Sequence, residues 1–349
     1  MSNPVVTINL VVLNGGKYIR HCLDAILMQT YPHELVEFNI LDNGSADKTK
    51  DIIRSLEIRI SDFGFAKFNF VESKLNFGMW PGQEELLKHS QGKYVLAMAV
   101  DVILDKDFIK NAVEVMEGDD KIGALQAKIY KYELNELRIT NYELRKEIID
   151  SCGFEIYKSR RIVNVGHGQK DGPEYGQEKE IFGVEGACPV FRREALENCS
   201  VSGEIFDHDY FWYGDDLDLA WRMNLLGWKQ IFAPSVIAWH DRQTTKNLRK
   251  SWADFVKMRR GVPMKKRRLD WRNTRFTIIK NDYTINILRD LPYLVKRELL
   301  LLGYILFFEP GVLLEIPNFL KMLPKILKKR KAIISRAIVG PEEIHKWFK

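Results

Sequence analysis

The first 110 residues alternate short apolar segments that favour β-strands with segments that have the periodicity of amphipathic helices. Repeated strand–helix units of this kind predict a mostly parallel sheet with helices on both faces. Strands are expected at residues 5–12, 36–41, 68–71 and 94–100, and helices at 17–29, 47–56 and 82–89. The fold class predicted for this part of the chain is therefore α/β.

After residue 110 the pattern becomes less regular. A polar stretch contains a long loop at 166–173, and a loop of that kind in a compact domain is usually functional or mobile. Two further strands are expected at 181–190 and 231–239. Between them lies an amphipathic helix at 216–226, which Gly227 ends. These elements extend the same domain.

Two common nucleotide-binding motifs are missing from the sequence. No G-x-G-x-x-G follows the first strand and no G-x-x-x-x-G-K-[ST] occurs, which argues against dinucleotide and P-loop sites. The cysteines have no C-x-x-C spacing, so they predict neither a zinc knuckle nor a disulfide framework. They are Cys22, Cys152, Cys188 and Cys199. This usage of cysteine fits a reducing cytoplasm.

Residues 1–4 run directly into the first strand, which favours a strand over a signal peptide.

Charge divides the chain into two regions. Residues 1–241 contain 27 Lys and Arg against 38 Asp and Glu, a net charge of −11, whereas residues 242–349 contain 26 against 9, a net charge of +17. We therefore predict two domains, 1–242 and 243–349. A basic region this pronounced favours a polyanionic partner, either nucleic acid or the anionic face of a membrane.

The C-terminal region is predicted to be helical, with clusters of Lys and Arg at 265–268 and 328–331. Its apolar run at 299–308 is too short to cross a membrane, because a span needs about 20 residues. Helices that lie in the membrane interface, with basic side chains on anionic headgroups, are the favoured interpretation. A helical domain with a solvated basic face, or an RNA-binding tail, stays open as the alternative.

Polar side chains stand at the ends of predicted strands, where open α/β sheets bind ligands. Asp42 could accept hydrogen bonds from a nucleobase or ribose, or it could cap the helix that follows. Asp101 could bind a hard divalent cation, with His240 as a second ligand for an ion such as Mn²⁺. A lone histidine is more often structural, so both readings of His240 stay open.

Three carboxylates crowd the start of the helix predicted at 216–226, namely Asp215, Asp216 and Asp218. One acid is enough to stabilise a helix N-terminus. Several acids placed together repel one another, which raises a carboxylate pKa toward the range that suits a general base. Helix capping and catalysis both explain this cluster, and catalysis is slightly favoured.

A set of short motifs occurs in a specific order along the chain. They are Val-Val-Leu-Asn at 11–14, Gln-Thr-Tyr-Pro at 29–32, Asp-Asn-Gly-Ser at 42–45, Asn-Phe-Gly at 76–78, Asp-Val-Ile-Leu at 101–104, Phe-Arg-Arg-Glu-Ala-Leu at 191–196, Asp-Asp-Leu-Asp-Leu at 215–219 and Gly-Trp-Lys at 227–229. The set resembles family 2 glycosyltransferases of the Rossmann-like GT-A fold, in particular the rhamnosyltransferase-like branch that builds bacterial surface polysaccharides. The likeness covers about residues 5–242, and a looser one continues at Arg272-Asn273 and Lys280-Asn281.

The resemblance implies roles for individual residues. The nucleotide sugar would bind at Asn14, Asp42, Asn76, Gly78 and Asp101. A divalent cation, Mg²⁺ or Mn²⁺, would bind at Asp101 and His240. Asp216 would be the general base, with Asp215 beside it where the family usually has Glu. The acceptor would bind at Gly186, Ala187, Asp218, Trp221 and Arg222, under a lid at 171–175. Ala99 departs from the family, whose metal motif usually begins there with Asp or Asn.

The implied function is an inverting, metal-dependent glycosyltransferase in bacterial cell-surface glycan synthesis. Its expected partners are a nucleotide-diphosphate sugar, first of all dTDP-rhamnose, and a lipid-linked or polysaccharide acceptor. A UDP-sugar donor is one alternative, and a catalytically weak membrane-bound nucleotide-binding scaffold, motivated by Ala99, is another. The expected location is cytoplasmic and peripheral, on the inner face of the cell membrane, with no nucleic acid partner.

Overall fold

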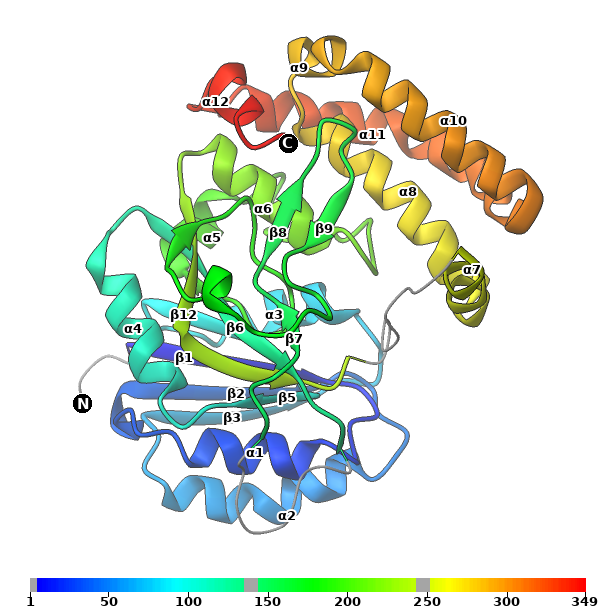
Figure 1. Cartoon of the computed structure of the whole chain (residues 1–349). Coiled ribbons are helices and arrows are strands. Elements are labelled where there is room, and N and C mark those ends of the chain that lie inside the picture. The colour runs from blue at the N-terminus through cyan, green and yellow to red at the C-terminus, as the bar shows by residue number, and fades with distance from the viewer. Residues whose placement is uncertain (1–4, 135–143, 243–251) are drawn as a thin grey trace.

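A ten-stranded sheet forms the centre of the computed structural model, which describes residues 5–134, 144–242 and 252–349 (Figure 1). The strands run in the order β10-β12-β6-β11-β4-β1-β2-β3, while β5 pairs with β12 and β7 with β6. Their bounds are β1 (Val6–Val12), β2 (Val36–Asp42), β3 (Lys67–Glu72), β4 (Tyr94–Ala99), β5 (Val102–Leu104), β6 (Ile122–Lys131), β7 (Ile149–Ser151), β10 (Lys179–Glu180), β11 (Val190–Arg192) and β12 (Lys229–His240). A separate hairpin pairs β8 (Phe154–Ile156) with β9 (Ile162–Asn164).

The first half of the sheet has the predicted parallel arrangement. Strands β3, β2, β1 and β4 are parallel neighbours, and every residue of β1 and β2 is buried. Strands buried on both faces are what a sheet covered by helices on each side requires. The second half is mixed, because β11 lies antiparallel between β4 and β6, whereas β6 and β12 run parallel.

Helices cover both faces of the sheet. Helices α1 (Ile19–Leu27) and α2 (Thr49–Asp62) lie together on one face, with α4 (Phe108–Gly118) further along the same core (Figure 1). Helix α3 (Met79–Leu87) packs on the opposite face, where Leu86 joins Val11 of β1 in a small apolar cluster. Helix α3 begins three residues before the predicted start, because a proline is tolerated in a first helical turn.

The strand predicted at 181–190 is wrong for most of its length. Only its last residue enters a strand, β11, and residues 181–189 are irregular. Pro189 has no N–H for a ladder, and Gly183 lies so close to the following helix that a Cβ there would be 2.7 Å from Cβ of Ala220. At Gly183 the chain therefore lies against that helix, α6 (Asp215–Leu225), and residues 181–189 keep only separate hydrogen bonds to the sheet.

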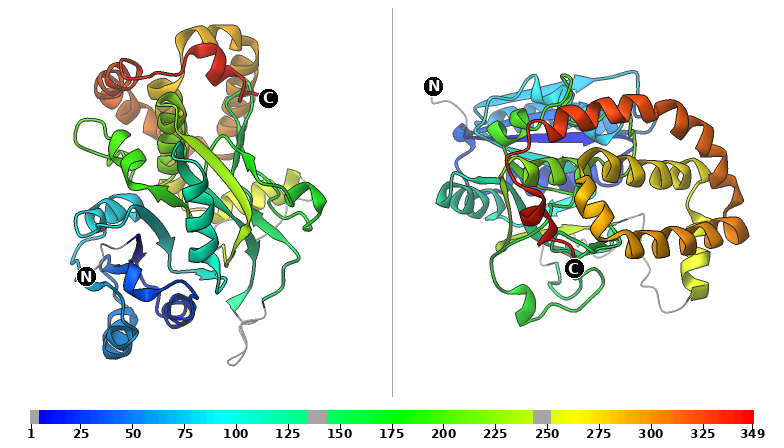
Figure 2. Two further views of the ribbon diagram at one scale, coloured as in Figure 1. Left: turned by 90° about the vertical axis from the view of Figure 1, so that its left-hand side faces the viewer. Right: turned by 90° about the horizontal axis from the view of Figure 1, so that it is seen from above.

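The C-terminal region is helical, as predicted, and packs beside α6 at one end of the sheet domain (Figure 2). Its helices are α7 (Trp252–Gly261), α8 (Met264–Asn281), α9 (Thr284–Arg289), α10 (Leu291–Phe308), α11 (Ile316–Ile334) and α12 (Pro341–His345), with a 3₁₀ turn η4 (Pro310–Glu315). The chain end returns to the first region, where the Lys349 amide donates to the Ile156 carbonyl at 3.1 Å. The start of the predicted second domain, 243–251, lies outside the described residues.

The described helices differ in length and apolar character. None of them alone is both long and apolar enough to cross a bilayer. One pair, Leu291–Phe308 with Pro310–Ile334, passes together by length and composition, although the two parts are bent by 111°.

Candidate functional site

The parallel arrangement brings several predicted residues to one edge of the sheet. Asp42 is the last residue of β2, Asp101 follows β4, and His240 is the last residue of β12. Pairing of β12 with β5 sets His240 opposite Val102, so its ring reaches the neighbouring Asp101. The Nε2 atom of His240 lies 3.5 Å from Oδ1 of Asp101. The two predicted metal ligands are therefore brought together.

His240 is oriented by a carboxylate that the sequence analysis missed. Its Nδ1 atom lies 2.9 Å from Oδ2 of Asp150, which is the fully buried middle residue of β7. Burial alone would lower the pKa of His240, but the charges of Asp101 and Asp150 raise it to about 10. Burial likewise opposes ionisation of Asp101, yet His240 keeps the pKa of that carboxyl below its ordinary value. Without a cation, this pair is an ionised carboxylate beside an imidazolium.

The chemistry of this pair fits a divalent cation with few protein ligands. Metal-binding histidines commonly give their other ring N–H to a carboxylate, and Asp150 occupies that position. Within residues 5–134, 144–242 and 252–349 no group of three or more His, Cys, Asp or Glu side chains is arranged to hold a metal. Asp101 and His240 would then supply two ligands and leave other positions for phosphate oxygens and water.

Arg242 links Asp150, the partner of His240, to Glu185. Its guanidinium donates to both carboxylate oxygens of Asp150, at 2.9 to 3.0 Å, and to Oε1 of Glu185 at 2.8 Å. Glu185 is itself buried and precedes Gly186. None of these three residues, Asp150, Glu185 or Arg242, stands in a recognisable motif, so the only sequence signal was the strand-like stretch around Glu185-Gly186.

Asp42 begins a turn that Asn14, from the segment after β1, contacts through hydrogen bonds. The Oδ2 atom of Asp42 accepts from the Ser45 amide at 3.2 Å, while its buried Oδ1 has no hydrogen-bond partner among the described residues. Asn14 has φ = 51°, and its Oδ1 accepts from the Ala46 amide at 2.8 Å. Asp42 thus stabilises the turn but does not cap the next helix, α2, whose N-cap is Lys48, and one carboxylate oxygen stays without a hydrogen-bond partner among the described residues.

Asn76 and Gly78 belong to a second loop at the same edge. Oδ1 of Asn76 accepts from the Gly78 amide at 2.8 Å, and the Asn43 side chain, next to Asp42, donates to the Gly78 carbonyl at 2.9 Å. Gly78 has φ = 92°, and a Cβ there would lie 2.9 Å from the Phe211 carbonyl oxygen. Asn43, which the sequence analysis left unassigned, therefore joins the two predicted nucleotide loops.

Asp215 and Asp216 differ in their surroundings. Asp215 is buried, and burial followed by the nearby charges of Asp216 and Asp218 raises its pKa well above the ordinary value. Asp216 is partly exposed, and burial of its carboxyl together with the charge of Glu185 raises its pKa to about 6. A partly accessible carboxylate with a pKa near neutrality suits proton abstraction better than a buried one.

The absence of a side chain at Gly186 leaves room for the carboxylate of Asp216. A Cβ at Gly186 would lie 2.9 Å from the Trp80 ring and 3.3 Å from Oδ2 of Asp216. Ala187 is buried, and its carbonyl accepts from the Ala99 amide at 2.9 Å, which ties this segment to β4. Gly186 therefore borders the predicted base, whereas Ala187 connects the segment to the sheet.

Three predicted acceptor residues are placed elsewhere, which corrects that part of the prediction. The side chains of Asp218, Trp221 and Arg222 are buried under the C-terminal helices. Arg222 binds Asp218 at 3.0 Å, and Trp221 packs edge to face against the Phe348 ring. These residues face the helix packing because α8, α11 and α12 cover that side of α6, so they offer no surface to an acceptor.

The predicted lid is tied to the sheet at one end. Asp171 accepts from the Lys128 amino group at 2.9 Å and also from the Tyr130 hydroxyl at 2.5 Å. Cys22, Cys152, Cys188 and Cys199 are each free and buried.

Relatives of known sequence share part of this chain. A glucuronosyltransferase of Methanococcus voltae, named for a dolichyl N-acetyl-α-D-glucosaminyl phosphate acceptor, is 29% identical over 116 residues, 32% of this chain and 34% of its own. The poly-β-1,6-N-acetyl-D-glucosamine synthase of Staphylococcus aureus is 23% identical over 234 residues, 67% of this chain and 49% of its own. The chain thus spans between a third and a half of these relatives.

Solved structures share the fold. A mannosyltransferase of Pyrobaculum calidifontis, in complex with GDP-Man and Mn²⁺, matches 96% of this chain and 86% of its own with a TM-score of 0.53 at 17% identity. GalNAc-T7, with UDP, GalNAc and Mn²⁺, matches 80% of this chain and 48% of its own with a TM-score of 0.56 at 12% identity. The predicted GT-A fold with a helical C-terminal region is therefore confirmed.

A family model matches more than half of the chain. The matched residues are 7–199, which contain β1 to β11 with the loops around Asp42, Asn76 and Asp101. Asp216 and His240 lie beyond the matched range, and they face this part of the chain through Gly186 and Asp101. The chain belongs to glycosyl transferase family 2.

Proposed function

We propose that this protein is an inverting, metal-dependent glycosyltransferase that transfers a sugar from a nucleoside diphosphate to an acceptor hydroxyl. The observation that carries the proposal is a continuous chain of contacts, which runs from Asp101 and His240 through Asp150, Arg242 and Glu185. It ends next to Asp216, whose pKa is raised to about 6 by burial and by the charge of Glu185. A cation-binding pair and a base of suitable pKa thus share one site.

In this mechanism one set of residues acts on the leaving diphosphate and another on the acceptor hydroxyl. The divalent cation on Asp101 and His240 would offset the negative charge of the departing diphosphate. Across the site, Asp216 accepts the proton of the acceptor hydroxyl as its oxygen bonds to the anomeric carbon and the bond to the diphosphate oxygen breaks. A single displacement of this kind inverts the anomeric centre.

For the donor we propose dTDP-rhamnose first, on the resemblance of the motifs to the rhamnosyltransferase-like branch. A UDP sugar is the alternative, and GDP sugars enter because the Pyrobaculum structure contains GDP-Man. The acceptor proposed is lipid-linked or a polysaccharide, a choice that the names of the Methanococcus and Staphylococcus relatives support.

Calorimetric titration with dTDP, UDP and GDP, each with and without Mn²⁺, tests the proposal. We expect one diphosphate to bind in a metal-dependent way, which would show that Asp101 and His240 suffice although Ala99 replaces the usual acid. Absence of binding by all three would favour a scaffold without donor chemistry.

We further propose that the C-terminal helices lie on the anionic inner surface of the cytoplasmic membrane. Apolar side chains of α10 and η4 are strongly exposed, with Phe307 at 83%, Leu314 at 69% and Leu300 at 67%. Exposed lysines follow on the next helix, α11, including Lys321 and Lys328. Exposed apolar side chains together with exposed cations suit the interface of an anionic bilayer.

Flotation with vesicles tests this location. We expect stronger recovery on vesicles that contain phosphatidylglycerol than on phosphatidylcholine alone, and reduced recovery for a Leu300→Gln, Phe307→Gln double variant. Equal recovery on both vesicle types would contradict the electrostatic part of the proposal.

A further inference from the structure

The loop that precedes the predicted base has an unusual backbone. Phe211 and Tyr213 have φ values of 63° and 65°, and Gly214 has φ = 87°. A residue with a side chain pays a steric cost in the left-handed conformation. Such a conformation therefore persists only where the surrounding structure imposes it. This loop leads directly into Asp215 and Asp216 at the start of α6, and whatever imposes its shape also sets the position of those carboxylates.

One side chain of α8 holds the loop. The side-chain amide of Asn273 donates to three loop carbonyls, those of Tyr210 at 3.0 Å, Trp212 at 2.7 Å and Tyr213 at 2.9 Å. Asn273 is fully buried, and a Cβ added at Gly214 would lie 3.5 Å from the Cβ of Asn273. The left-handed residues keep these loop carbonyls out of the regular hydrogen bonding of a helix or sheet. The amide group of Asn273 supplies hydrogen bonds to them instead.

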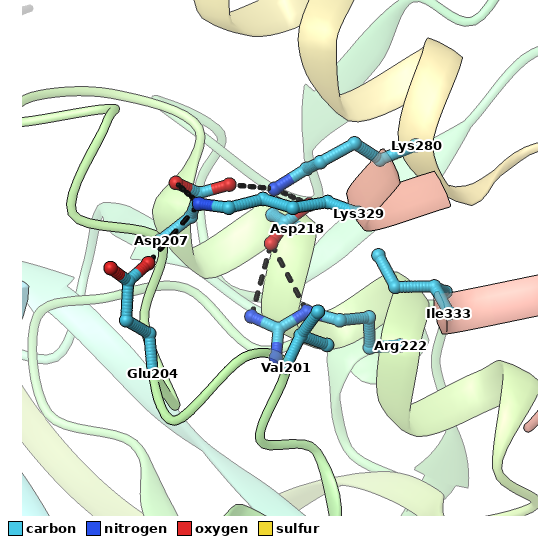
Figure 3. A pocket seen from close by; sticks show the side chains of 8 residues that line it. All are labelled: Val201, Glu204, Asp207, Asp218, Arg222, Lys280, Lys329 and Ile333. Carbon is cyan, nitrogen blue, oxygen red and sulfur yellow. Dashed lines mark hydrogen bonds and ion pairs between the residues drawn. The ribbon is translucent and has the colours of Figure 1, made fainter. Parts of the chain in front are cut away.

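Neighbouring turns of α8 and α11 fasten both ends of the loop. Thr277, one turn after Asn273, hydrogen-bonds the Tyr210 hydroxyl at 2.9 Å. Figure 3 shows the amino groups of Lys280 and Lys329 against carboxylates that precede and follow the loop. Lys280 contacts Asp207 and lies 2.9 Å from Asp218, and Lys329 lies 2.6 Å from Asp207. Although burial opposes it, these two cations lower the pKa of Asp207 well below its ordinary value.

The same loop touches the predicted nucleotide side of the site. The Phe211 carbonyl would lie 2.9 Å from a Cβ at Gly78, so the loop occupies the space between α8 and the loop that contains Asn76. A shift of the loop would therefore change the distance between the bound donor and Asp216. Misplacement of a reacting group by about 1 Å can cost about 100-fold in rate.

From these contacts we infer that Asn273 is a positioning residue for Asp216, and that α8 of the C-terminal region completes the catalytic site. Helix α8 lies outside the residues 7–199 that the family model matches. The inference rests on the proposed function insofar as Asp216 is the base. The arrangement of the loop itself does not depend on that assignment.

Asn273→Asp tests the inference, with Asn286→Asp as the matched control. Asn286 is equally buried and donates to the Pro341 carbonyl at 2.9 Å, within the C-terminal helices. In Asn273→Asp a carboxylate faces the three carbonyls and repels them. We expect kcat to fall about 100-fold, with the donor KM and the Mn²⁺-dependent diphosphate affinity within about twofold of the parent, and Asn286→Asp to retain the parent kcat per folded molecule.

Hydrogen exchange of the peptide at 208–217 provides a readout independent of turnover. We expect faster exchange there in Asn273→Asp than in the parent or in Asn286→Asp. Unchanged exchange, a kcat within threefold of the parent, or equal losses in both variants would overturn the positioning role. If Asn273→Asp does not fold, Asn273→Ser, which keeps one donor, is measured by the same criteria. A parent without turnover on any donor would refute the proposed function, while the exchange data would still decide the role of Asn273.

Discussion

The half of the proposed site that would bind the donor, with Asp42, Asp101 and His240, differs from the half that would supply the base, with Asp215, Asp216 and the loop at 210–214. We call them the donor half and the base half. The donor half stands on strand ends, so main-chain pairing in the sheet sets the position of each side chain. The base half stands on a loop with left-handed residues, held by the side chain of Asn273. The comparison shows that one half of the proposed site is placed by strand pairing and the other half by a side chain of α8.

The largest expected effect separates the two halves by removing the base. In Asp216→Asn we expect turnover to fall about 10³-fold, because a positioned general base contributes 10²- to 10⁴-fold. The Mn²⁺-dependent affinity for the nucleoside diphosphate should stay unchanged, since the donor half is intact. Initial rates and calorimetry measure the two quantities, and unchanged turnover would refute the assignment of Asp216 as the base.

The next effect concerns the ion pairs of Lys280 that hold the loop of the base half in place. In Lys280→Met the buried carboxylates of Asp207 and Asp218 lose a cation, and we expect the free energy of unfolding to decrease by about 3 kcal/mol. Chemical denaturation measures it. Lys346→Met, which removes an exposed ion pair with Glu343, is the control and should change stability little. Equal stabilities of the two variants would mean that the Lys280 pairs contribute nothing beyond packing.

A smaller effect tests the donor half. In Asp150→Asn the ring of His240 loses its carboxylate partner, and we expect the Mn²⁺-dependent diphosphate affinity to fall about 10- to 100-fold. Binding without Mn²⁺ should not change. The control is Asp282→Asn, which alters a carboxylate that is equally buried and bonded to Arg160, far from the metal pair. A wild-type metal dependence in Asp150→Asn would argue against His240 as a ligand.

The smallest effect is a shift of the pH profile. The carboxylate of Asp216 accepts a proton only when ionised, so kcat should rise with pH up to about 6, its raised pKa, and level off above it. The charge of Glu185 contributes to that pKa, so Glu185→Gln should move the rising limb to lower pH. Glu180→Gln, which alters an exposed carboxylate on β10, should leave the limb unchanged. A profile that is the same in all three proteins would exclude Glu185 as the source of the shift.

Much of the donor half was predictable from the sequence. Alternating strands and helices place Asp42 and Asp101 at strand ends, and parallel pairing brings such ends to one edge. Asp150 and Arg242 were missed, because Asp150 lies in the three-residue strand β7, too short for a periodic pattern, and Arg242 lies in the segment after β12. The acceptor role predicted for Trp221 and Arg222 failed for a related reason: the periodicity of α6 shows which residues share a face but not what covers that face.

The sequence by itself determined the α/β class, the family and the basic, helical character of the C-terminal region, because these follow from local periodicity, short motifs and summed charge. Only the tertiary structure decided that α8 lies against the loop before Asp216 and that Asn273 donates to its carbonyls. About 60 residues separate the two partners along the chain, and hydrogen bonds over such a separation are selected by the packing of whole elements, which no local pattern encodes.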